Sequence, residues 1–352
     1  MAIETSEWLN PVRDDAPTGD DVSFSDVFDK IREARRSDDP DLPQGDWEHE
    51  LKAANWREVI KLAGSVLAEQ SKDLQAAVWL GEALIAQHGL DGAHGACELL
   101  AELMDRYWDE MYPRVEDDDL DERAGKLAWF NDYAAQAVSA VPLAPGDPPY
   151  TLLDWHVSRE VDNLSRQNAE AFQEAVGEGK PTGEIFDKAV ESAPDAKLRE
   201  QYELSIRAVA AFERFKAVCD ARLGVAGPSL NTLQEALKRI VQILGKAARA
   251  KGLIGAEEAA EALGEGGEGG DGASAGAFNL GGGDAANKAA AIRALGEIAA
   301  WFKRVEPHSP VSFLLERAVL WSDTPLDQWL AEVVPDESTL AGIRSRIGLP
   351  NN

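Results

Sequence analysis

The stretch from Trp56 to Leu80, WREVIKLAGSVLAEQSKDLQAAVWL, contains two apolar patterns with the spacing of an α-helix. In its first half, apolar residues return every three or four positions, which places them on one helix face. The polar run Ser71–Asp73 interrupts this pattern, and Asp73 is of a residue type that caps helix N-termini. The stretch therefore predicts two helices joined by a short turn. The first pattern consists of Trp56, Val59, Ile60, Ala63, Val66 and Leu67.

The second of these helices is predicted to end at a pair of glycines. Gly89 and Gly92 are expected to stop it, because glycine readily adopts the positive φ angles found at helix C-termini. The same helical spacing then resumes and predicts a third helix that continues to Tyr107.

Residues 1–140 are predicted to form one N-terminal helical domain. A further helix is expected to begin near Arg123, after an acidic run at 116–122 that indicates a solvated loop. The first 50 residues are polar and interrupted by prolines, so a short helix is predicted there only over residues 24–35.

The rest of the chain is predicted to be helical as well, in two parts separated by a linker. Four prolines between residues 141 and 149 mark a boundary, and a middle helical region is expected over residues 150–253. Residues 254–285 are rich in glycine and acidic residues and cannot bury enough apolar area to offset the entropy lost on ordering. We therefore predict a flexible linker there and a small helical C-terminal oligomerisation domain over residues 286–352. The fold class is all-α.

Composition and charge exclude several classes of partner. The chain has 352 residues, and its 35 Lys and Arg against 63 Asp and Glu give a formal net charge of −28. A field of this sign repels phosphate and anionic lipid head groups, so we expect no nucleic acid partner and no direct membrane insertion. No signal peptide pattern follows Met1, which favours a cytoplasmic protein. Cys97 and Cys219 are expected to be apolar core residues.

Sequence motifs that carry chemistry occur here in the wrong context. Residues 264–269 fit the G-x-G-x-x-G motif of dinucleotide sites and residues 272–276 fit the G-x-S-x-G nucleophile elbow, but neither follows a predicted strand. His49–Glu50 begins a zinc motif whose second histidine is replaced by Ala53. We therefore expect no catalytic residue, metal ligand or cofactor. A catalytic site assembled in space from distant residues remains an alternative.

The turn from Glu306 to Pro310 is the sharpest feature of the C-terminal region. Pro307 and Pro310 fix φ and lack N–H donors, so one helix must end before the turn. Ser309 is expected to cap the next helix, with Pro310 as its first residue. The turn is either a plain corner between helices or part of a subunit contact in which Glu306 pairs with Arg317.

The apolar content of residues 286–352 predicts self-association. A unit of this size is near the limit at which one core is stable alone, yet it is rich in large apolar residues. Such a surplus is commonly buried against further copies in a closed symmetric assembly. Oligomerisation or partner contacts are predicted at Trp301, Glu306, Pro307, Ser309, Pro310, Phe313, Leu314, Arg317, Trp321 and Trp329.

An ordered series of short motifs between residues 8 and 135 resembles the ImpA-type N-terminal domain. It begins with LNPV at 9–12 and the D-x-P-x-G-D pattern at 15–20 and continues through the stretch from Trp56 to Leu80. No single piece is specific, but the series in this order is. The residues that carry the resemblance are Pro11, Pro17, Gly19, Trp56, Asp73, Leu74, Trp79, Leu80, Gly89, Gly92, Tyr107, Trp108, Pro113 and Arg123.

The C-terminal region resembles that of the TssA family of the bacterial type VI secretion system. EPHSP at 306–310 and FLLERA at 313–318 are similar to its Glu-Pro-x-Ser-Pro and Leu-Leu-x-Arg-Ala signature. His308 departs from it, since a small polar residue is expected at this position. The length of the chain resembles the short, baseplate-associated type of the family.

This resemblance implies a non-enzymatic assembly protein. It implies a ring-like homo-oligomer formed through the C-terminal region, which associates with baseplate components and helps prime polymerisation of the tube and sheath proteins. The chain is then expected at the cytosolic side of the inner-membrane-anchored secretion complex. A helical adaptor unrelated to secretion and an enzyme with a spatially assembled site are the alternatives.

Overall fold

Two units make up the chain, Met1–Gly267 and Glu268–Asn352. The computed structural model describes residues 3–38 and 52–255, and of the remainder residues 299, 303, 310–321, 324 and 329. The division between the units falls within residues 254–285, the predicted linker, of which only residues 254 and 255 are among those described.

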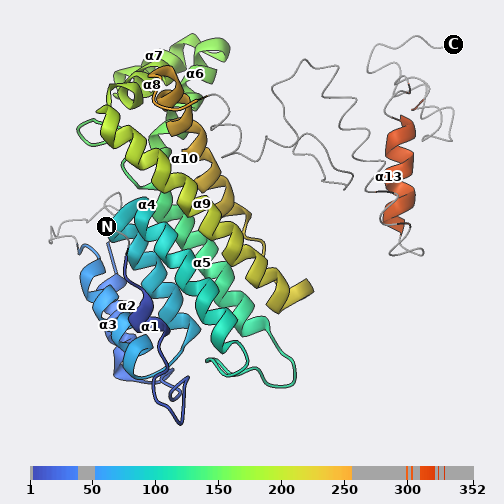
Figure 1. Cartoon of the computed structure of the whole chain (residues 1–352). Coiled ribbons are helices and arrows are strands. Elements are labelled where there is room, and N and C mark those ends of the chain that lie inside the picture. The colour runs from blue at the N-terminus through green and yellow to red at the C-terminus, as the bar shows by residue number, and fades with distance from the viewer. Residues whose placement is uncertain are drawn as a thin grey trace, which may run out of the picture. The chain divides into compact units, whose positions relative to one another are not determined.

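Helices account for every regular element among the described residues, so the predicted all-α class is confirmed (Figure 1). No strand occurs there, only three isolated β-bridges. In the second unit, α13 covers Pro310–Trp321. The elements of the first unit are α1 (Ser6–Leu9), α2 (Asp26–Arg35), α3 (Trp56–Glu69), α4 (Leu74–Tyr107), α5 (Asp121–Ser139), α6 (Leu152–Gln167), α7 (Ala169–Gly177), α8 (Gly183–Ser192), α9 (Asp195–Leu223), the 3-10 turn η1 (Gly224–Ala226) and α10 (Asn231–Ala250).

Helix α4 is the centre of the first unit and is broken where the sequence predicts. At Gly89 the backbone leaves the helical region, with φ 60° and ψ −130°, so α4 consists of two helical segments joined by a kink. Gly92 does not end a helix, contrary to expectation. It is buried where the second segment meets the first, and a Cβ atom there would lie 2.0 Å from the carbonyl oxygen of Leu84. Only glycine allows this approach.

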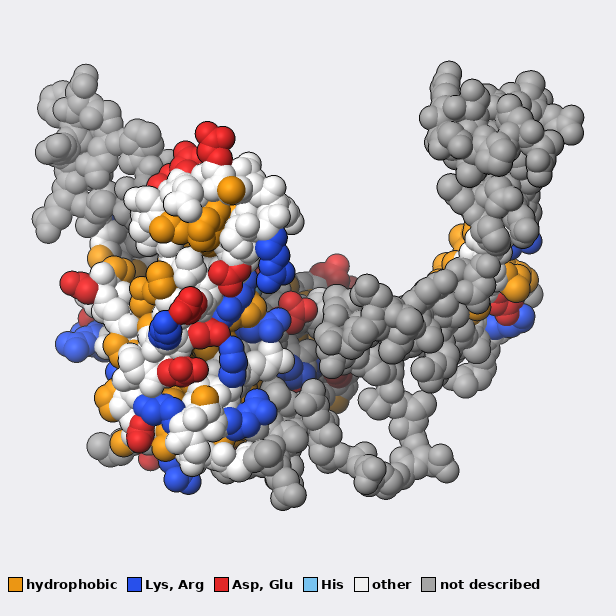
Figure 2. All heavy atoms as spheres, turned by 90° about the horizontal axis from the view of Figure 1, so that it is seen from above, with side chains coloured by type: hydrophobic (Ala, Val, Ile, Leu, Met, Phe, Trp, Pro, Cys, Tyr) orange, Lys and Arg blue, Asp and Glu red, His pale blue; other side chains and the backbone are white. Residues whose placement is uncertain are grey.

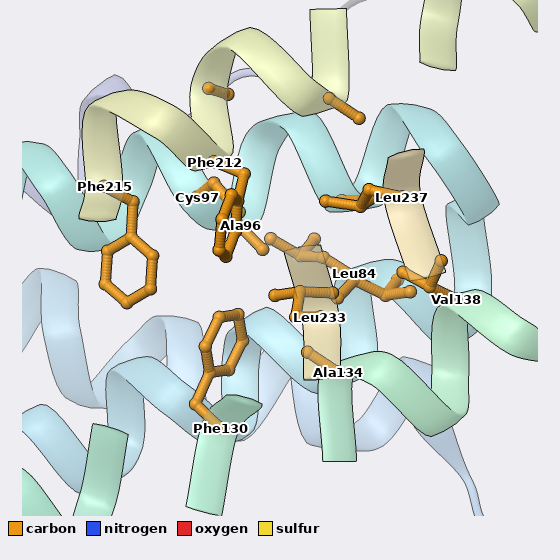
Figure 3. Packing of buried hydrophobic residues seen from close by; sticks show 14 of the residues in the cluster. Leu84, Ala96, Cys97, Phe130, Ala134, Val138, Phe212, Phe215, Leu233 and Leu237 are labelled. Carbon is orange, nitrogen blue, oxygen red and sulfur yellow. The ribbon is translucent and has the colours of Figure 1, made fainter. Parts of the chain in front are cut away.

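The two predicted helical regions of the first unit share one hydrophobic core. Helix α4 packs against α3, α5 and α9, and α10 packs against both α5 and α9. In this core the rings of Phe130 on α5 and Phe215 on α9 meet edge to face at 5.8 Å (Figure 3). Leu84 of α4 and Leu233 of α10 are buried in the same cluster. The proline-rich connector contributes as well, since Leu143 is buried. Residues 1–140 and 150–253 therefore bury their apolar faces against each other.

Polar contacts fasten α9 along α4. Arg214 forms ion pairs with Glu98, Glu102 and Asp105, which lie one after another on the α4 surface. Arg222 donates to the carbonyl oxygen of Asp105 at 3.0 Å. These side chains are partly exposed, so each pair contributes little alone and the buried core provides most of the stability.

One buried polar contact joins α5 to the start of α10. The side-chain oxygen of Asn131 accepts a hydrogen bond from the backbone N–H of Leu233 at 3.1 Å. It thereby satisfies one of the N–H groups that a helix N-terminus leaves unpaired. A residue of the N-terminal region thus caps a helix of the middle region.

Candidate functional site

The N-terminal motif residues attach the first segment of the chain to the turn between α3 and α4. Gly19 forms an antiparallel bridge with Ser71, and the N–H of Asp20 donates to the carbonyl of Gln70 at 3.0 Å. Gly19 has φ 70°, and a Cβ atom there would lie 2.0 Å from the Gln70 carbonyl oxygen. Glycine is therefore required for this close contact. Pro17 is partly buried beside it, whereas Pro11 is exposed.

Lys72 is the buried centre of this attachment. Its Nζ donates to the carbonyl oxygens of Trp8 at 2.8 Å and Leu67 at 2.5 Å, and lies 5.6 Å from the centre of the Tyr107 ring. The hydroxyl of Tyr107 donates in turn to the carbonyl of Leu9 at 2.8 Å. Burial lowers the pKa of Lys72 to about 8. Lys72 thus joins α1 and α3 through main-chain carbonyls and contacts α4 through the Tyr107 ring.

Asp73 caps α4, as the sequence predicts. Its Oδ1 accepts from the N–H of Ala76 at 2.9 Å. Burial raises its pKa to about 6, although the backbone hydrogen bonds act in the opposite direction. Leu74, the first residue of α4, donates its N–H to the carbonyl of Tyr112 at 2.7 Å. The start of α4 is therefore tied to the loop that follows its end.

Arg123 holds that loop in place. The side chain is buried, and it donates to the carbonyl oxygens of Trp108 at 2.6 Å, Met111 at 2.7 Å and Pro113 at 2.9 Å. Its guanidinium also lies 4.5 Å from the centre of the Trp108 ring. Burial lowers the pKa of Arg123 to about 10. Arg123, Trp108 and Pro113 therefore form a structural clamp between α4 and α5.

The remaining motif residues are packing residues. Leu74 and Leu80 are fully buried, and the ring of Trp79 contacts that of Phe28 edge to face at 5.1 Å. Trp56 is partly buried at the start of α3. The structure thus places most of the motif in the interior, where it maintains the fold of the N-terminal region.

A largely buried ion pair lies beside the motif residues, and no local sequence pattern predicts it. Arg35 of α2 donates through Nε to Glu82 of α4 at 2.6 Å, and its guanidinium lies 4.6 Å from the centre of the Trp129 ring. Burial raises the pKa of Glu82, while its bonds to Arg35 act to lower it. The pair lies on the wall of a surface groove of about 500 Å³ that Trp56 and Tyr133 also line. Arg35 and Glu82 are 47 positions apart, so no local pattern relates them.

Helix α13 carries the described part of the predicted oligomerisation surface. Pro310 is its first residue, as predicted. Phe313, Leu314 and Leu320 expose 58%, 67% and 70% of their surface. Several large apolar side chains of this short helix are therefore exposed to solvent.

Of the other predicted contact residues, Arg317 and Trp321 lie on α13, Trp329 contacts Trp321, and the rest lie outside the described residues. Arg317 lies with its guanidinium 5.3 Å from the centre of the Trp321 ring, and Trp321 meets Trp329 edge to face at 6.0 Å. The structure does not describe Trp301, Glu306, Pro307 and Ser309, so the pairing of Glu306 with Arg317 stays a prediction.

Neither a metal-binding cluster nor a membrane-spanning helix occurs among the described residues. The described residues contain no group of three or more His, Cys, Asp or Glu side chains placed to hold a metal ion. Cys97 and Cys219 are free and buried, as expected. No helix among those described is both long and apolar enough to cross a bilayer.

Known proteins with the same N-terminal domain match this chain. The family model described as "ImpA, N-terminal, type VI secretion system" matches residues 9–132. The type VI secretion system component TssA1 of Pseudomonas aeruginosa is 25% identical over 341 residues, which cover 95% of this chain and 96% of the relative.

A solved structure extends the match beyond the family model. It is the N-terminal domain, including the conserved ImpA_N region, of the TssA component from Burkholderia cenocepacia. It is 31% identical, with a TM-score of 0.63, and the match covers 72% of this chain and 96% of that structure. The likeness therefore includes helices on both sides of the proline-rich connector.

The fold and the N-terminal motif thus define an all-α component of the type VI secretion system with an ImpA-type N-terminal domain. Within that class the match extends over nearly the whole chain and includes the C-terminal region. The chain belongs to the TssA family.

Proposed function

We propose that this TssA component is a non-enzymatic scaffold that forms a ring-like homo-oligomer through residues 286–352. The ring is of the short type that associates with baseplate components on the cytoplasmic side of the inner-membrane-anchored complex. There it helps prime polymerisation of the tube and sheath proteins. Residues 1–140 and 150–253, joined through the predicted linker at 254–285, present the surfaces that contact these partners.

The exposed apolar surface of α13 is the observation that carries this proposal. A lone small unit gains no stability from Phe313, Leu314 and Leu320 while these side chains face water. Burial against further copies of the same helix region removes them from water, and closed rings satisfy such contacts without leaving a free patch.

The strongly shifted pKa values favour a scaffold over an enzyme. Lys72, Asp73 and Arg123 have altered pKa values because they are buried, and each bonds to main-chain groups that hold the fold together. Shifted groups of an enzyme would instead converge on a pocket that admits a substrate. None of the three residues lines the cavity between α6, α8 and α10, the groove beside Arg35 and Glu82, or the hollow beside Asp91 and Arg207.

A pair of single substitutions tests the proposal. Leu314→Glu places a charge in the α13 surface, and it should dissociate the oligomer when the molar mass of the full chain is measured by light scattering. Val225→Glu is the matched control, because Val225 is a fully exposed apolar residue of η1 in the first unit. The control should leave the mass unchanged. An oligomer that survives Leu314→Glu intact would contradict an interface on α13.

A further inference from the structure

A small cavity lies between α6, α8 and α10, away from the N-terminal motif and from α13. Its volume is about 210 Å³, below the roughly 300–1,000 Å³ of small-molecule sites. Val190, Ile243 and Ala247 are buried and form apolar parts of its wall. A cavity of this size and lining suits one anchoring side chain of a partner.

Three cationic side chains surround this cavity, and two of them are already paired. Arg159 and Lys246 both donate to the carboxylate of Asp187, Lys246 at 2.6 Å. Burial acts to raise the pKa of Asp187, but these bonds outweigh it and hold the pKa below its ordinary value. Asp187 therefore stays ionised and is shared between the two cations.

The third cation, Arg239, contacts an aromatic ring and a side-chain amide instead of a carboxylate. Its guanidinium lies 4.7 Å from the centre of the Trp155 ring, and its Nη1 donates to the side-chain oxygen of Gln242 at 2.7 Å. It forms no ion pair with any residue in the described part of the chain. Stacking on an indole orients a guanidinium while leaving its in-plane donors available to a carboxylate.

We propose that this cavity binds a Glu or Asp side chain within an acidic peptide segment of a partner protein. The carboxylate bonds to Arg239, and neighbouring apolar atoms of the peptide contact Val190 and Ile243. Three basic and two acidic side chains line this cavity in a chain of net charge −28, and the basic excess provides charge complementarity for such a segment. Figure 2 views the molecule from the end at which Figure 1 shows α6–α8, and basic, acidic and apolar side chains are interspersed at that end.

A nucleic acid fits this cavity less well than a peptide. Asp187 and Glu191 line it together with the cations, and they repel a continuous phosphate backbone. An acidic side chain carries a single charge that Arg239 can bind, so it meets less repulsion from these carboxylates than a continuous phosphate backbone does.

The inference rests on the scaffold function proposed above, but its test is separate. Peptide binding is measured at a cavity of the first unit, whereas ring formation is measured as molar mass. A chain that forms rings and binds no peptide would contradict only the cavity proposal, and a monomeric chain that binds peptide would contradict only the ring.

The experiment measures fluorescence polarisation of a short labelled peptide of alternating Glu and Leu, titrated with the full-length chain. Arg239→Glu should weaken binding by about tenfold or more. Lys238→Glu is the matched control. Lys238 directly precedes Arg239 on α10 and lies outside the cavity, where it pairs with Glu213 of α9 at 3.3 Å. It makes the same change in charge and should leave binding within about twofold. Melting curves of both variants check the fold.

Several results would overturn the proposal. Absence of binding by the unaltered chain would do so, as would equal weakening by Arg239→Glu and Lys238→Glu, which indicates a general charge effect. A peptide with Gln in place of Glu should bind weakly, and equal binding would mean that no carboxylate is recognised. A single-stranded oligonucleotide that binds more tightly than the peptide, and depends on Arg239, would identify a polyanion site instead.

Discussion

Replacing Asp73 by Asn should change how the stability of the first unit depends on pH. Burial raises the pKa of Asp73 from an ordinary value of 3.8 to about 6. The folded state therefore holds the proton more tightly than the unfolded state does. Protonated Asp73 stabilises the folded state relative to the unfolded state. This contribution is complete below the unfolded pKa and is lost as the pH rises through about 6. A shift of about two pKa units corresponds to ~3 kcal/mol of unfolding free energy.

Asparagine keeps the cap and removes the titration. Its side-chain oxygen accepts the same hydrogen bond from Ala76, and Asn is as good an N-cap as Asp. We expect the unfolding free energy of Asp73→Asn, relative to the unaltered chain, to rise by about 2–3 kcal/mol between about pH 4 and pH 7. Urea unfolding followed by tryptophan fluorescence measures this difference at each pH.

Asp21→Asn provides a control of opposite sign. The N–H and hydroxyl of Ser23 both donate to Asp21, and these bonds lower its pKa. Its contribution is present above its ordinary pKa and is lost as the pH falls. The relative stability of this variant should therefore change in the opposite direction, chiefly below about pH 4, and should stay nearly flat between about pH 4 and pH 7. A difference for Asp73→Asn that is flat between about pH 4 and pH 7, or falls with pH, would refute the burial argument.

Four further substitutions test other parts of the structure. Gly92→Ala should destabilise the first unit by about 1–3 kcal/mol or more in urea unfolding, because its Cβ would lie 2.0 Å from the Leu84 carbonyl oxygen. Gly125→Ala is the control, because this glycine lies in a helix with open space around it, and the change should be neutral or stabilising. If Gly92→Ala and Gly125→Ala changed the unfolding free energy equally, the close packing at Gly92 of α4 would be contradicted. Arg123→Ala leaves three main-chain carbonyls without their donor and should lower the melting temperature, by an amount equivalent to about 3 kcal/mol. Arg317→Glu should dissociate the oligomer if Arg317 bonds across subunits, and an intact oligomer in light scattering would leave Glu306–Pro310 a plain corner.

Features that depend on neighbouring residues were predictable from the sequence. The cap at Asp73, the kink at Gly89 and the start of α13 at Pro310 each follow from the conformational preference of one residue and its neighbours. Helix α9 was predictable for the same reason, because apolar residues from Leu198 to Cys219 recur every three or four positions. Helices α6–α8 were expected only as part of a helical region, because each buries few residues and so shows a weak apolar pattern.

Features that join distant parts of the chain were not predictable. The pair Arg35–Glu82 and the cap of Leu233 by Asn131 join residues 47 and 102 positions apart, so only the packing of the helices brings them together. The structural role of Lys72 was not predictable from the sequence, because a lysine in a polar turn is usually exposed. One of its two carbonyl partners, Leu67, is five residues away, but the other, Trp8, is 64 residues away and lies beside Lys72 only because the chain packs α1 there.

The mass of the full chain in solution tests the central claim most directly. At micromolar concentration, light scattering should give a molar mass several times that of the 38.1 kDa chain, while a chain ending at Gly255 should be a monomer or a small oligomer. A monomeric full chain under these conditions, or a truncated chain that keeps the large mass, would contradict a ring formed through residues 286–352.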